Sequence, residues 1–379
     1  MKATLTNKSI RNNNCYNILN ALLKHHSLQR SELTKESNVS VMTVKKIVDD
    51  LLARGILVEI PTESTVGRKP KALKFDDKFG CFGCIDLTSK NKINYFVYDL
   101  YSKKMAEESF VITDYESYVE VLKTLMVSME ANFNRTKLVP LGIAISVPSI
   151  YYSDTDEVNY DLIPGFKGLH LKDLFYNHFH LDNILIMHDV NAVAIDEYKK
   201  SGASSLYYFY IGDGVGGSLV KDGELIAGEN LAAGEIGQCL ISTSSGYATL
   251  ENAISAVSIS QRVEDCIKVK LDFSQIIRRY YDKDSTICSI VDEAIDHALQ
   301  FIYNLCWIIN PSIIIIDSNY YEYAKLIVAS AEKCMSMLST SPIKNSTVIR
   351  LPYTSNHYNM LNLLDLLKDN WIVSISNLT

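Results

Sequence analysis

Residues 205–251 read SLYYFYIGDGVGGSLVKDGELIAGENLAAGEIGQCLISTSSGYATLE, and this stretch decides the fold of the chain. The apolar, aromatic run Leu206–Ile211 predicts a buried strand. Glycine fills four of the next six positions, 212–217, and predicts a turn whose backbone can fold tightly and approach a ligand. A second strand over Ser218–Val220 then turns through Asp222-Gly223, which is a hairpin signal.

Further along, the stretch carries a Gly-Glu-x-Gly segment at 234–237 and a later acid, Glu251. A glycine-rich turn between strands is weak evidence by itself, but the order of these features is more specific. It resembles the ROK family (repressors, open reading frames, kinases), whose members share the hexokinase/actin-like ATPase fold. The resemblance implies that the glycine turn faces ATP phosphates in the kinases. It also implies that Glu235 and Glu251, with Gln238 in place of a family His, bind sugar hydroxyls.

The composition is that of an ordinary globular protein, with 379 residues, 47% of them hydrophobic and 21% charged. This length allows two or three domains. We see no apolar run long enough to cross a bilayer and no signal-peptide core in the first residues, so we expect a cytoplasmic protein. The eight irregularly spaced cysteines indicate reduced thiols. Cys81 and Cys84 form a lone CxxC, for which core packing is favoured over a redox pair.

Charge divides unevenly along the chain. Residues 1–75 hold 13 basic and 6 acidic side chains, a net charge of +7, whereas residues 76–379 hold 24 and 38, a net charge of −14. A basic head on an acidic body indicates that the head meets a polyanion and the body does not. A chance imbalance of the surface is the alternative, so the head needs a motif in support.

The head carries such a motif, because apolar residues recur at helical spacing and predict a first helix of about three turns. Ser31 is placed to cap a short second helix, and Ser40 to cap a third helix over residues 41–53. On the third helix, the apolar side chains at helical spacing are expected to face the core, and they are Val44, Ile47, Val48, Leu51 and Leu52. This is the pattern of a helix-turn-helix DNA-binding domain, and it predicts DNA contacts by Ser40, Met42, Thr43, Lys45 and Lys46.

A β-wing is predicted after the third helix, with strands at 56–60 and 72–75 and a tip at 61–66. The basic segment Gly67-Arg68-Lys69-Pro70-Lys71 lies between them, and we expect Arg68 and Lys69 to contact DNA, Arg68 in a minor groove. A solvated basic hairpin is the alternative. The sequence therefore predicts a winged helix-turn-helix domain over residues 1–75, similar to the head of ROK repressors of the xylose and N-acetylglucosamine type.

The resemblance implies an α/β body with two lobes and a cleft between them. We predict lobe 1 over residues 76–190 and lobe 2 over residues 191–379, with a C-terminal segment that can return to lobe 1. Strands are expected at 81–86 and 93–100, a helix at 115–131, and a strand at 138–146. Family kinases carry a DxGGT loop after the first strand, but residues 86–90 here contain no glycine.

The next expected site follows a buried strand at 184–187, where His188 and Asp189 lead into a helix. The resemblance implies that Asp189 matches the general base of the kinases and that His188 replaces a sugar-binding Asn. A helix cap is the alternative role for Asp189. We expect Asp189 to contact ligand without catalysis.

Nucleotide binding is poorly supported. Asp213 stands where the family turn carries Thr, and a carboxylate about 5 Å from a phosphate would repel it by about 3 kcal/mol. A helix at 290–309 and a strand at 312–316 are predicted, but the loop at 317–320 lacks the family's glycines. Three phosphate-binding elements of the family therefore lack glycine or carry added bulk or charge in this chain. We expect no ATP and no other cofactor.

The structural zinc site of the family is also missing. Family members carry a His in GExGH and cysteines in a CxCGxxGC loop, which is a strong metal signal. This chain has Gln238 and a cysteine-free loop at 242–249, and lone Cys239 cannot build a tetrahedral site. We predict no metal.

Together these features predict a transcription regulator, a repressor that binds a palindromic operator as a homodimer or homotetramer and responds to a sugar-like effector. An active ROK sugar kinase with an added DNA-binding head is one alternative. A regulator without ligand, whose body serves only assembly, is another.

Overall fold

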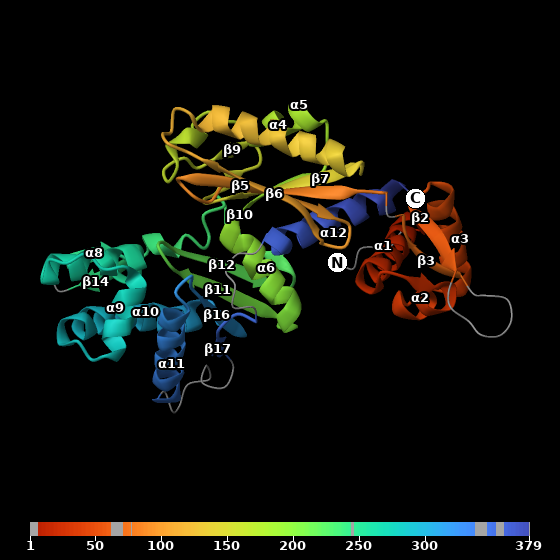
Figure 1. Ribbon diagram of the computed structural model, residues 1–379. Coiled ribbons are helices and arrows are strands. Elements are labelled where there is room, and N and C mark those ends of the chain that lie inside the picture. Colours follow the sequence, from red (N-terminus) through yellow and green to blue (C-terminus); the bar gives the residue numbers. More distant parts are fainter. Residues whose placement is uncertain are drawn as a thin grey trace. The chain divides into compact units, whose positions relative to one another are not determined.

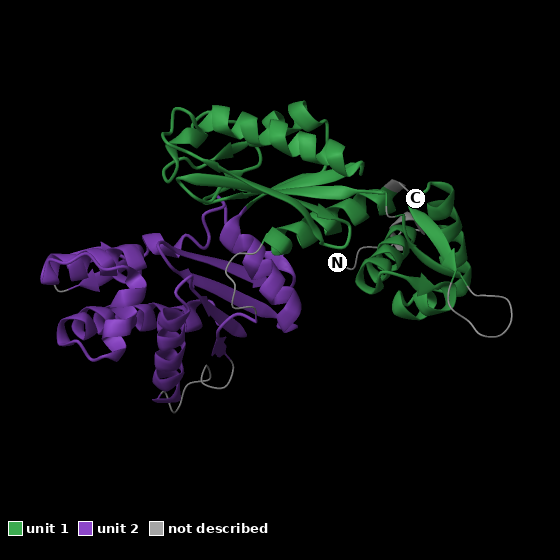
Figure 2. Ribbon diagram, viewed as in Figure 1, with its two compact units in different colours: residues 1–187, 360–379 green, residues 188–359 purple. Residues whose placement is uncertain are grey.

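The computed structural model describes residues 7–61, 71–76, 78–243, 246–337, 347–353 and 360–378. The chain divides into two compact units, one of residues 1–187 and 360–379 and the other of residues 188–359 (Figure 2). The first unit therefore contains both the N-terminal head and the C-terminal helix. The predicted domain limits at 75 and 190 stay predictions.

The head is a bundle of three helices with a small sheet of order β1-β3-β2 (Figure 1). Its core is built from the apolar residues that gave the helical spacing, since Ile18, Leu19 and Leu22 are fully buried. The third helix buries Val44, Ile47, Val48 and Leu51 as expected. The elements are α1 (Asn7–His25), β1 (Leu28–Gln29), α2 (Arg30–Glu36), α3 (Val41–Ala53), β2 (Leu57–Pro61) and β3 (Lys71–Phe75).

The predicted cap of α2 is wrong. The helix begins at Arg30, with Gln29 at the cap position, and the Gln29 backbone N–H donates to Glu32 Oε2 at 2.7 Å. Ser31 therefore lies inside the first turn. The short strand β1 pairs with β3 just ahead of the helix, and the helix starts two residues earlier than the predicted cap implies.

The rest of the first unit is built on a five-stranded sheet of order β10-β7-β4-β5-β6. Helices α4 and α5 lie over one face of this sheet and α12 over the other (Figure 1). The elements are β4 (Cys81–Asp86), β5 (Lys92–Asp99), β6 (Lys104–Val111), α4 (Tyr118–Thr136), β7 (Pro140–Val147), β8 (Tyr151–Tyr152), β9 (Glu157–Val158), η1 (Pro164–Phe166), α5 (Leu171–Phe179), β10 (Ile184–His188) and α12 (Met360–Leu378).

The second unit also has a five-stranded sheet, of order β13-β12-β11-β16-β17. Helix α6 packs on one face, and the opposite face carries the core shared by α7, α8, α9, α10 and α11. The elements are α6 (Asp189–Ser201), β11 (Ser205–Ile211), β12 (Val215–Lys221), β13 (Glu224–Leu225), η2 (Ile236–Gln238), β14 (Leu240–Thr243), β15 (Gly246–Thr249), α7 (Leu250–Ile254), α8 (Ala256–Ile267), α9 (Phe273–Tyr281), α10 (Ser285–Ile308), β16 (Ile313–Asp317), α11 (Tyr321–Met337) and β17 (Val348–Arg350).

Both sheets follow the same plan. In each, three consecutive strands pair antiparallel and two later strands add on the other side of the first, with β7 parallel to β4 and β16 parallel to β11. Helices cover both faces, which parallel strands require because they are buried on each side. The predicted α/β fold class is confirmed.

The predicted glycine turn is shorter than expected. Ile211 pairs with Val215, so only residues 212–214 form the connection, and Gly216 and Gly217 lie inside β12. The next hairpin is as predicted, because Asp222 and Gly223 have φ of 52° and 87°, the positive values that the favoured two-residue turn needs.

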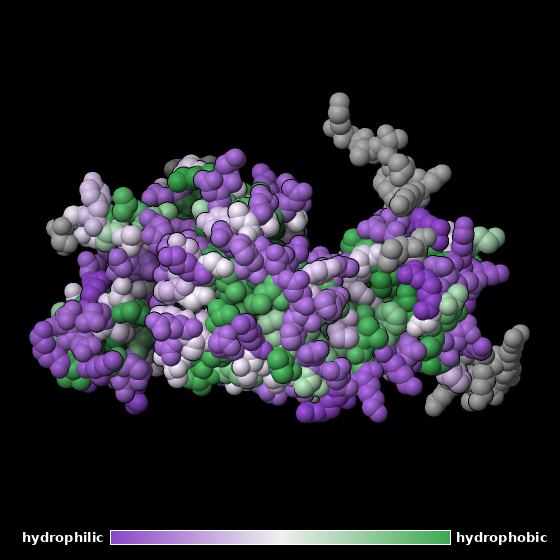
Figure 3. Space-filling view, turned by 90° about the horizontal axis from the view of Figure 1, so that it is seen from above, coloured by the Kyte–Doolittle hydropathy of each residue, from purple (hydrophilic) through white to green (hydrophobic). Residues whose placement is uncertain are grey.

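The surface mixes residue types. On the face shown in Figure 3, hydrophobic residues form small groups among hydrophilic ones, as is usual because apolar atoms make up much of any protein surface. None of the described helices is long and apolar enough to span a membrane.

Candidate functional site

The first turn of α3 exposes several of its side chains. Ser40 caps it, since its Oγ accepts from the Thr43 backbone N–H at 3.3 Å and lies 2.9 Å from Thr43 Oγ1. Met42, Lys45 and Lys46 point to solvent. The predicted DNA-contact residues of α3 therefore divide into two that shape the helix start and three that extend from it.

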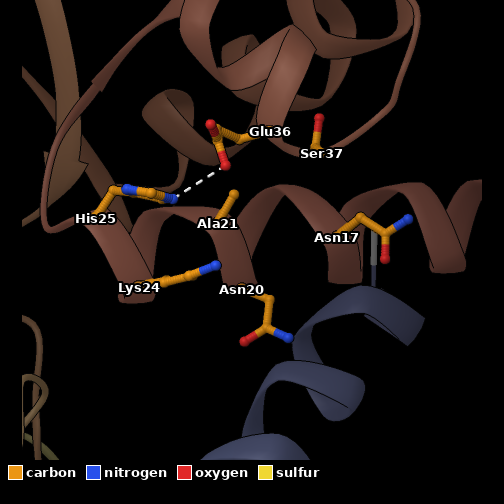
Figure 4. Close-up of a pocket in the computed structure, with 7 residues that line it drawn as sticks. All are labelled: Asn17, Asn20, Ala21, Lys24, His25, Glu36 and Ser37. Carbon is orange, nitrogen blue, oxygen red and sulfur yellow. Dashed lines mark hydrogen bonds and ion pairs between the residues drawn. The ribbon is translucent and has the colours of Figure 1, made fainter. Parts of the chain in front are cut away.

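Helices α1 and α2 are tied together beside a polar pocket of about 370 Å³. Figure 4 shows the tie, in which His25 Nε2 lies 3.1 Å from Glu36 Oε2. The pocket is lined by Asn17, Asn20, Ala21, Lys24, His25, Glu36 and Ser37. These polar contacts hold the end of α1 against the helix-turn-helix pair.

A charged network joins the wing to the helices. Arg30 bonds Asp49 Oδ1 at 3.0 Å and Glu59 Oε1 at 3.3 Å, and Lys71 bonds Glu59 Oε2 at 2.7 Å. The cations and the N–H donors lower the pKa of Glu59, with the Lys71 bond as the main cause. Sequence reasoning missed Arg30, because only folding brings its two acidic partners together. The predicted DNA contacts Arg68 and Lys69 lie outside the described residues.

Three of the five predicted ligand residues meet where β10 ends and α6 begins. His188 Nε2 lies 3.2 Å from Asp189 Oδ1, and His188 Nδ1 lies 3.7 Å from Glu235 Oε1. Asp189 Oδ1 also accepts the Val190 backbone N–H at 2.7 Å, within the first turn of α6, whose cap position is His188. The result is an imidazole between two carboxylates.

The segment at 234–238 rests directly on β12, which explains its glycines. A Cβ on Gly237 would come within 2.5 Å of Val215 O, and one on Gly234 within 2.3 Å of Gly217 O. Glu251, in the first turn of α7, accepts the Val215 backbone N–H at 3.0 Å. Glu251 therefore holds the glycine hairpin in place, and exposed Gln238 lies at the end of the same segment.

A tyrosine and an aspartate join the glycine turn at 212–214 to the loop after β16. The Tyr320 hydroxyl donates to Asp213 Oδ1 at 2.8 Å, joining the loop after β16 to the 212–214 turn. A Cβ on Gly212 would lie 2.5 Å from Asn319 Oδ1, so this loop also packs on the turn itself. Asp317 is buried and accepts from the Tyr208 hydroxyl at 2.6 Å. The two loops of the second unit for which the family resemblance implies phosphate contacts therefore bond to and pack on each other.

We expect Tyr320→Phe to lower the free energy of unfolding by about 1 kcal/mol, the net value of one hydrogen bond. Burial, and then the bond to Asp213, raise the pKa of Tyr320 to about 12. The raised folded-state pKa means that the contribution is complete below the unfolded value, about 10, and is lost as pH rises through about 12. Urea unfolding at neutral pH measures it. Tyr321→Phe, on a 47% exposed neighbour, is the control, and an equal loss there would contradict the assignment.

The loop at 86–90, which stands where family kinases carry DxGGT, forms its own internal hydrogen bonds. Asp86 Oδ1 accepts from the Thr88 backbone N–H at 3.0 Å and from the Thr88 hydroxyl at 2.6 Å. Leu87 between them is fully buried. The Asp86 carboxylate is therefore bonded within its own loop. Family kinases have glycines in this loop.

The described residues contain no cluster of three or more His, Cys, Asp or Glu side chains that could hold a metal ion. The region of the family zinc loop forms the β14–β15 hairpin instead, paired from Leu240↔Thr249 to Thr243↔Gly246. Cys239 is exposed beside it. The absence of a structural zinc stays a prediction.

Comparison with known proteins settles the family. Residues 82–369 match the ROK family. The chain belongs to the ROK family. It is 24% identical over 327 residues to the xylose repressor of Staphylococcus xylosus, covering 83% of this chain and 84% of that protein.

Solved structures agree with the ROK fold. The chain is similar to a crystal structure of a ROK family transcriptional regulator, a homolog of the E. coli MLC protein, with a TM-score of 0.77, 19% identity, and coverage of 97% of this chain and 99% of the other. It is also similar to the ROK hexokinase of Thermus thermophilus, with a TM-score of 0.61, 16% identity, and coverage of 76% and 99%. The regulator thus spans nearly all of this ROK chain, whereas the kinase spans about three quarters.

Proposed function

We propose that this ROK protein is a sequence-specific DNA-binding transcription regulator, a repressor controlled by a sugar or sugar derivative. The observation that carries the proposal is the exposed start of α3, where Met42, Lys45 and Lys46 extend from the second helix of a helix-turn-helix. Proteins of this class place that end of the helix at the base edges of the major groove. Similarity to a xylose repressor over 83% of this chain supports the same function.

The effector site we propose is the cluster of His188, Asp189 and Glu235, extended by Gln238 and Glu251. Carboxylates accept hydrogen bonds from sugar hydroxyls, and an imidazole or amide adds a donor. The Asp213–Tyr320 bond supports the absence of ATP, because an incoming phosphate would have to break it and face the carboxylate. The body therefore acts as a sensor rather than a sugar kinase, without cofactor or metal.

Assembly and location complete the proposal. The protein acts as a homodimer or homotetramer on a palindromic operator, in the cytoplasm where the DNA lies. Paired heads read half-sites about one or two helical turns apart. An effector needs only to bind two conformations differently, and a coupling of about 1–3 kcal/mol between effector and DNA is common.

A combined binding screen tests this function. DNA fragments recovered by the full-length protein from sheared genomic DNA are assayed with and without sugars, amino sugars and their phosphates. Thermal shifts are measured for the same compounds, with and without Mg-ATP. We expect at least one sugar-class compound to shift both melting and DNA affinity. Phosphorylation of a sugar, abolished by Asp189→Asn, would identify a kinase instead, and DNA binding that responds to no compound would identify a regulator without ligand.

The basic residues of the head give a separate prediction. Replacing Lys45 and Lys46, or Arg68 and Lys69, with alanine should flatten the dependence of DNA affinity on salt, by about 0.9 in the log–log slope for each phosphate that the variant no longer neutralises. Titration of DNA at several salt concentrations measures the slope. Lys123→Ala, on an exposed lysine of α4, is the control, and an unchanged slope in a head variant would remove that pair from the interface.

A further inference from the structure

The first turn of α3 exposes two large apolar side chains that the core does not use. Val41 is 73% exposed and Met42 77% exposed, whereas Val44, three residues after Val41, is 1% exposed. Since the inner face of α3 already provides the packing, polar residues could stand at both positions without loss to the fold. Their exposure instead indicates a surface that meets an apolar partner group.

Val41 also lies at the edge of a groove of about 550 Å³ between α2 and α3. Thr34, Val41 and Val44 supply apolar surface in this groove, and the exposed cations Lys35 and Lys45 lie beside them. The other charged pair of the groove is internally neutralised, because Arg30 bonds Asp49 at 3.0 Å. The groove therefore combines apolar surface with two exposed positive side chains.

An occupant that fits must present small apolar groups between negative charges. The major groove of DNA does so at thymine, whose 5-methyl group projects between the two phosphate backbones. Charge complementarity thus selects DNA over an apolar protein segment.

Hydrogen-bond readout by α3 is limited, which favours methyl contacts. Residues 41–53, VMTVKKIVDDLLA, contain no Arg, Asn or Gln, so Lys45 and Lys46 are their only side chains of the kinds that bond guanine or adenine through two atoms. The Thr43 hydroxyl is engaged with Ser40 Oγ at 2.9 Å. Lys45 and Lys46 are the remaining long polar side chains near the helix start, and both can also reach phosphates.

We propose that Val41 and Met42 determine operator specificity by packing against thymine 5-methyl groups in the major groove. The inference rests on the DNA-binding function proposed above and adds the base chemistry that this helix reads. It predicts thymine, at one or two fixed positions in each half-site, as the base that the protein recognises through α3.

The test uses the full-length protein and removes one methyl group at a time. A binding sequence is first selected from random duplexes, and each thymine is then replaced by deoxyuridine, which keeps every hydrogen-bonding group. We expect affinity to fall about fourfold for each methyl group that the protein contacts, the factor for one buried carbon. Because the protein is unchanged in this comparison, misfolding cannot account for a loss.

Variants assign the contact to residues. In Val41→Ala and Met42→Ala, the ratio of affinities for the thymine and deoxyuridine duplexes should approach one, whereas Lys46→Ala should weaken both duplexes equally. An enriched sequence that tolerates deoxyuridine at every position with less than about a 1.5-fold change overturns this inference alone. If no sequence is enriched, the proposed function fails with it.

Discussion

Replacing Trp371 with alanine is expected to lower the free energy of unfolding by about 3–5 kcal/mol, the range for removing a large aromatic side chain from a core. Trp371 is 5% exposed. Its ring centroid lies 5.9 Å from that of Phe75 in the head, 6.0 Å from Phe79 in the connecting segment and 5.8 Å from Phe82 in β4. One ring on α12 thus touches three consecutive parts of the chain.

Trp371→Ala should also change the proteolysis pattern, because α12 contacts α1 of the head. Tyr16 donates to Asp369 Oδ1 at 3.4 Å, and Asn12 Nδ2 donates to Asn377 Oδ1 at 2.7 Å. Tyr101 adds a ring contact to His26 at 4.6 Å between centroids. With the Trp371 ring removed, the head loses its aromatic contact with α12, so limited proteolysis should cut between head and body sooner than in the unchanged protein.

Chemical unfolding and limited proteolysis measure the two effects. The matched control is Val373→Ala, on the same helix but 47% exposed, which should change stability by no more than about 0.5 kcal/mol. A Trp371→Ala protein that lost less than about 1 kcal/mol, or that lost stability with an unchanged cleavage pattern, would contradict the role of α12 as the link between head and body.

Buried strands were the part of the fold most accessible from sequence. The predicted strand at 81–86 coincides with β4, and those at 206–211 and 312–316 fall within one residue of β11 and β16, because strands covered on both faces read as continuous apolar runs. The edge strand β6, KMAEESFV, was not predicted. Most of its residues are exposed, so it carries neither an apolar run nor strict alternation.

Contacts between distant parts of the chain could not be read from the sequence. The sequence predicts that the Asp213 carboxylate repels a phosphate. Its bond to Tyr320 joins residues 107 positions apart, and no local sequence pattern indicates this bond. The same holds for α12, which packs on α1 from the other end of the chain. Glu235 and His188 were assigned through family motifs, and their 3.7 Å separation follows from the fold, while their role toward a ligand stays a prediction.

A buried ion pair gives the other large expected effect. Arg350→Ala should destabilise the protein by about 3–5 kcal/mol, because it leaves a buried carboxylate without its cation. Glu197 on α6 is 1% exposed, and its Oε2 lies 3.2 Å from Arg350 Nη2. Its Oε1 accepts the Tyr353 backbone N–H at 2.9 Å, and the guanidinium stacks 3.7 Å from the centroid of the Tyr353 ring. The pair therefore fixes β17 and the segment after it to α6.

The free energy of unfolding that Arg350→Ala loses should depend on pH. Burial raises the pKa of Glu197, against the lowering effects of the Tyr353 N–H bond and Arg350. A carboxyl whose folded-state pKa is raised favours folding most when protonated, and that contribution is lost as pH rises through the folded-state value. Without Arg350 the ionised form loses its hydrogen-bonded cation, so the loss of stability should be larger at about pH 8 than at about pH 5.

Two further variants separate charge from packing. Glu197→Gln combined with Arg350→Met removes both charges and keeps an acceptor for the Tyr353 N–H, so it should recover most of the stability that Arg350→Ala loses. Lys200→Ala breaks an exposed pair with Asp196 on the same helix, 2.6 Å apart, and should cost no more than about 1 kcal/mol. A double variant as unstable as Arg350→Ala, with a deficit that is flat in pH, would show that stacking on Tyr353 rather than charge holds this edge of the sheet.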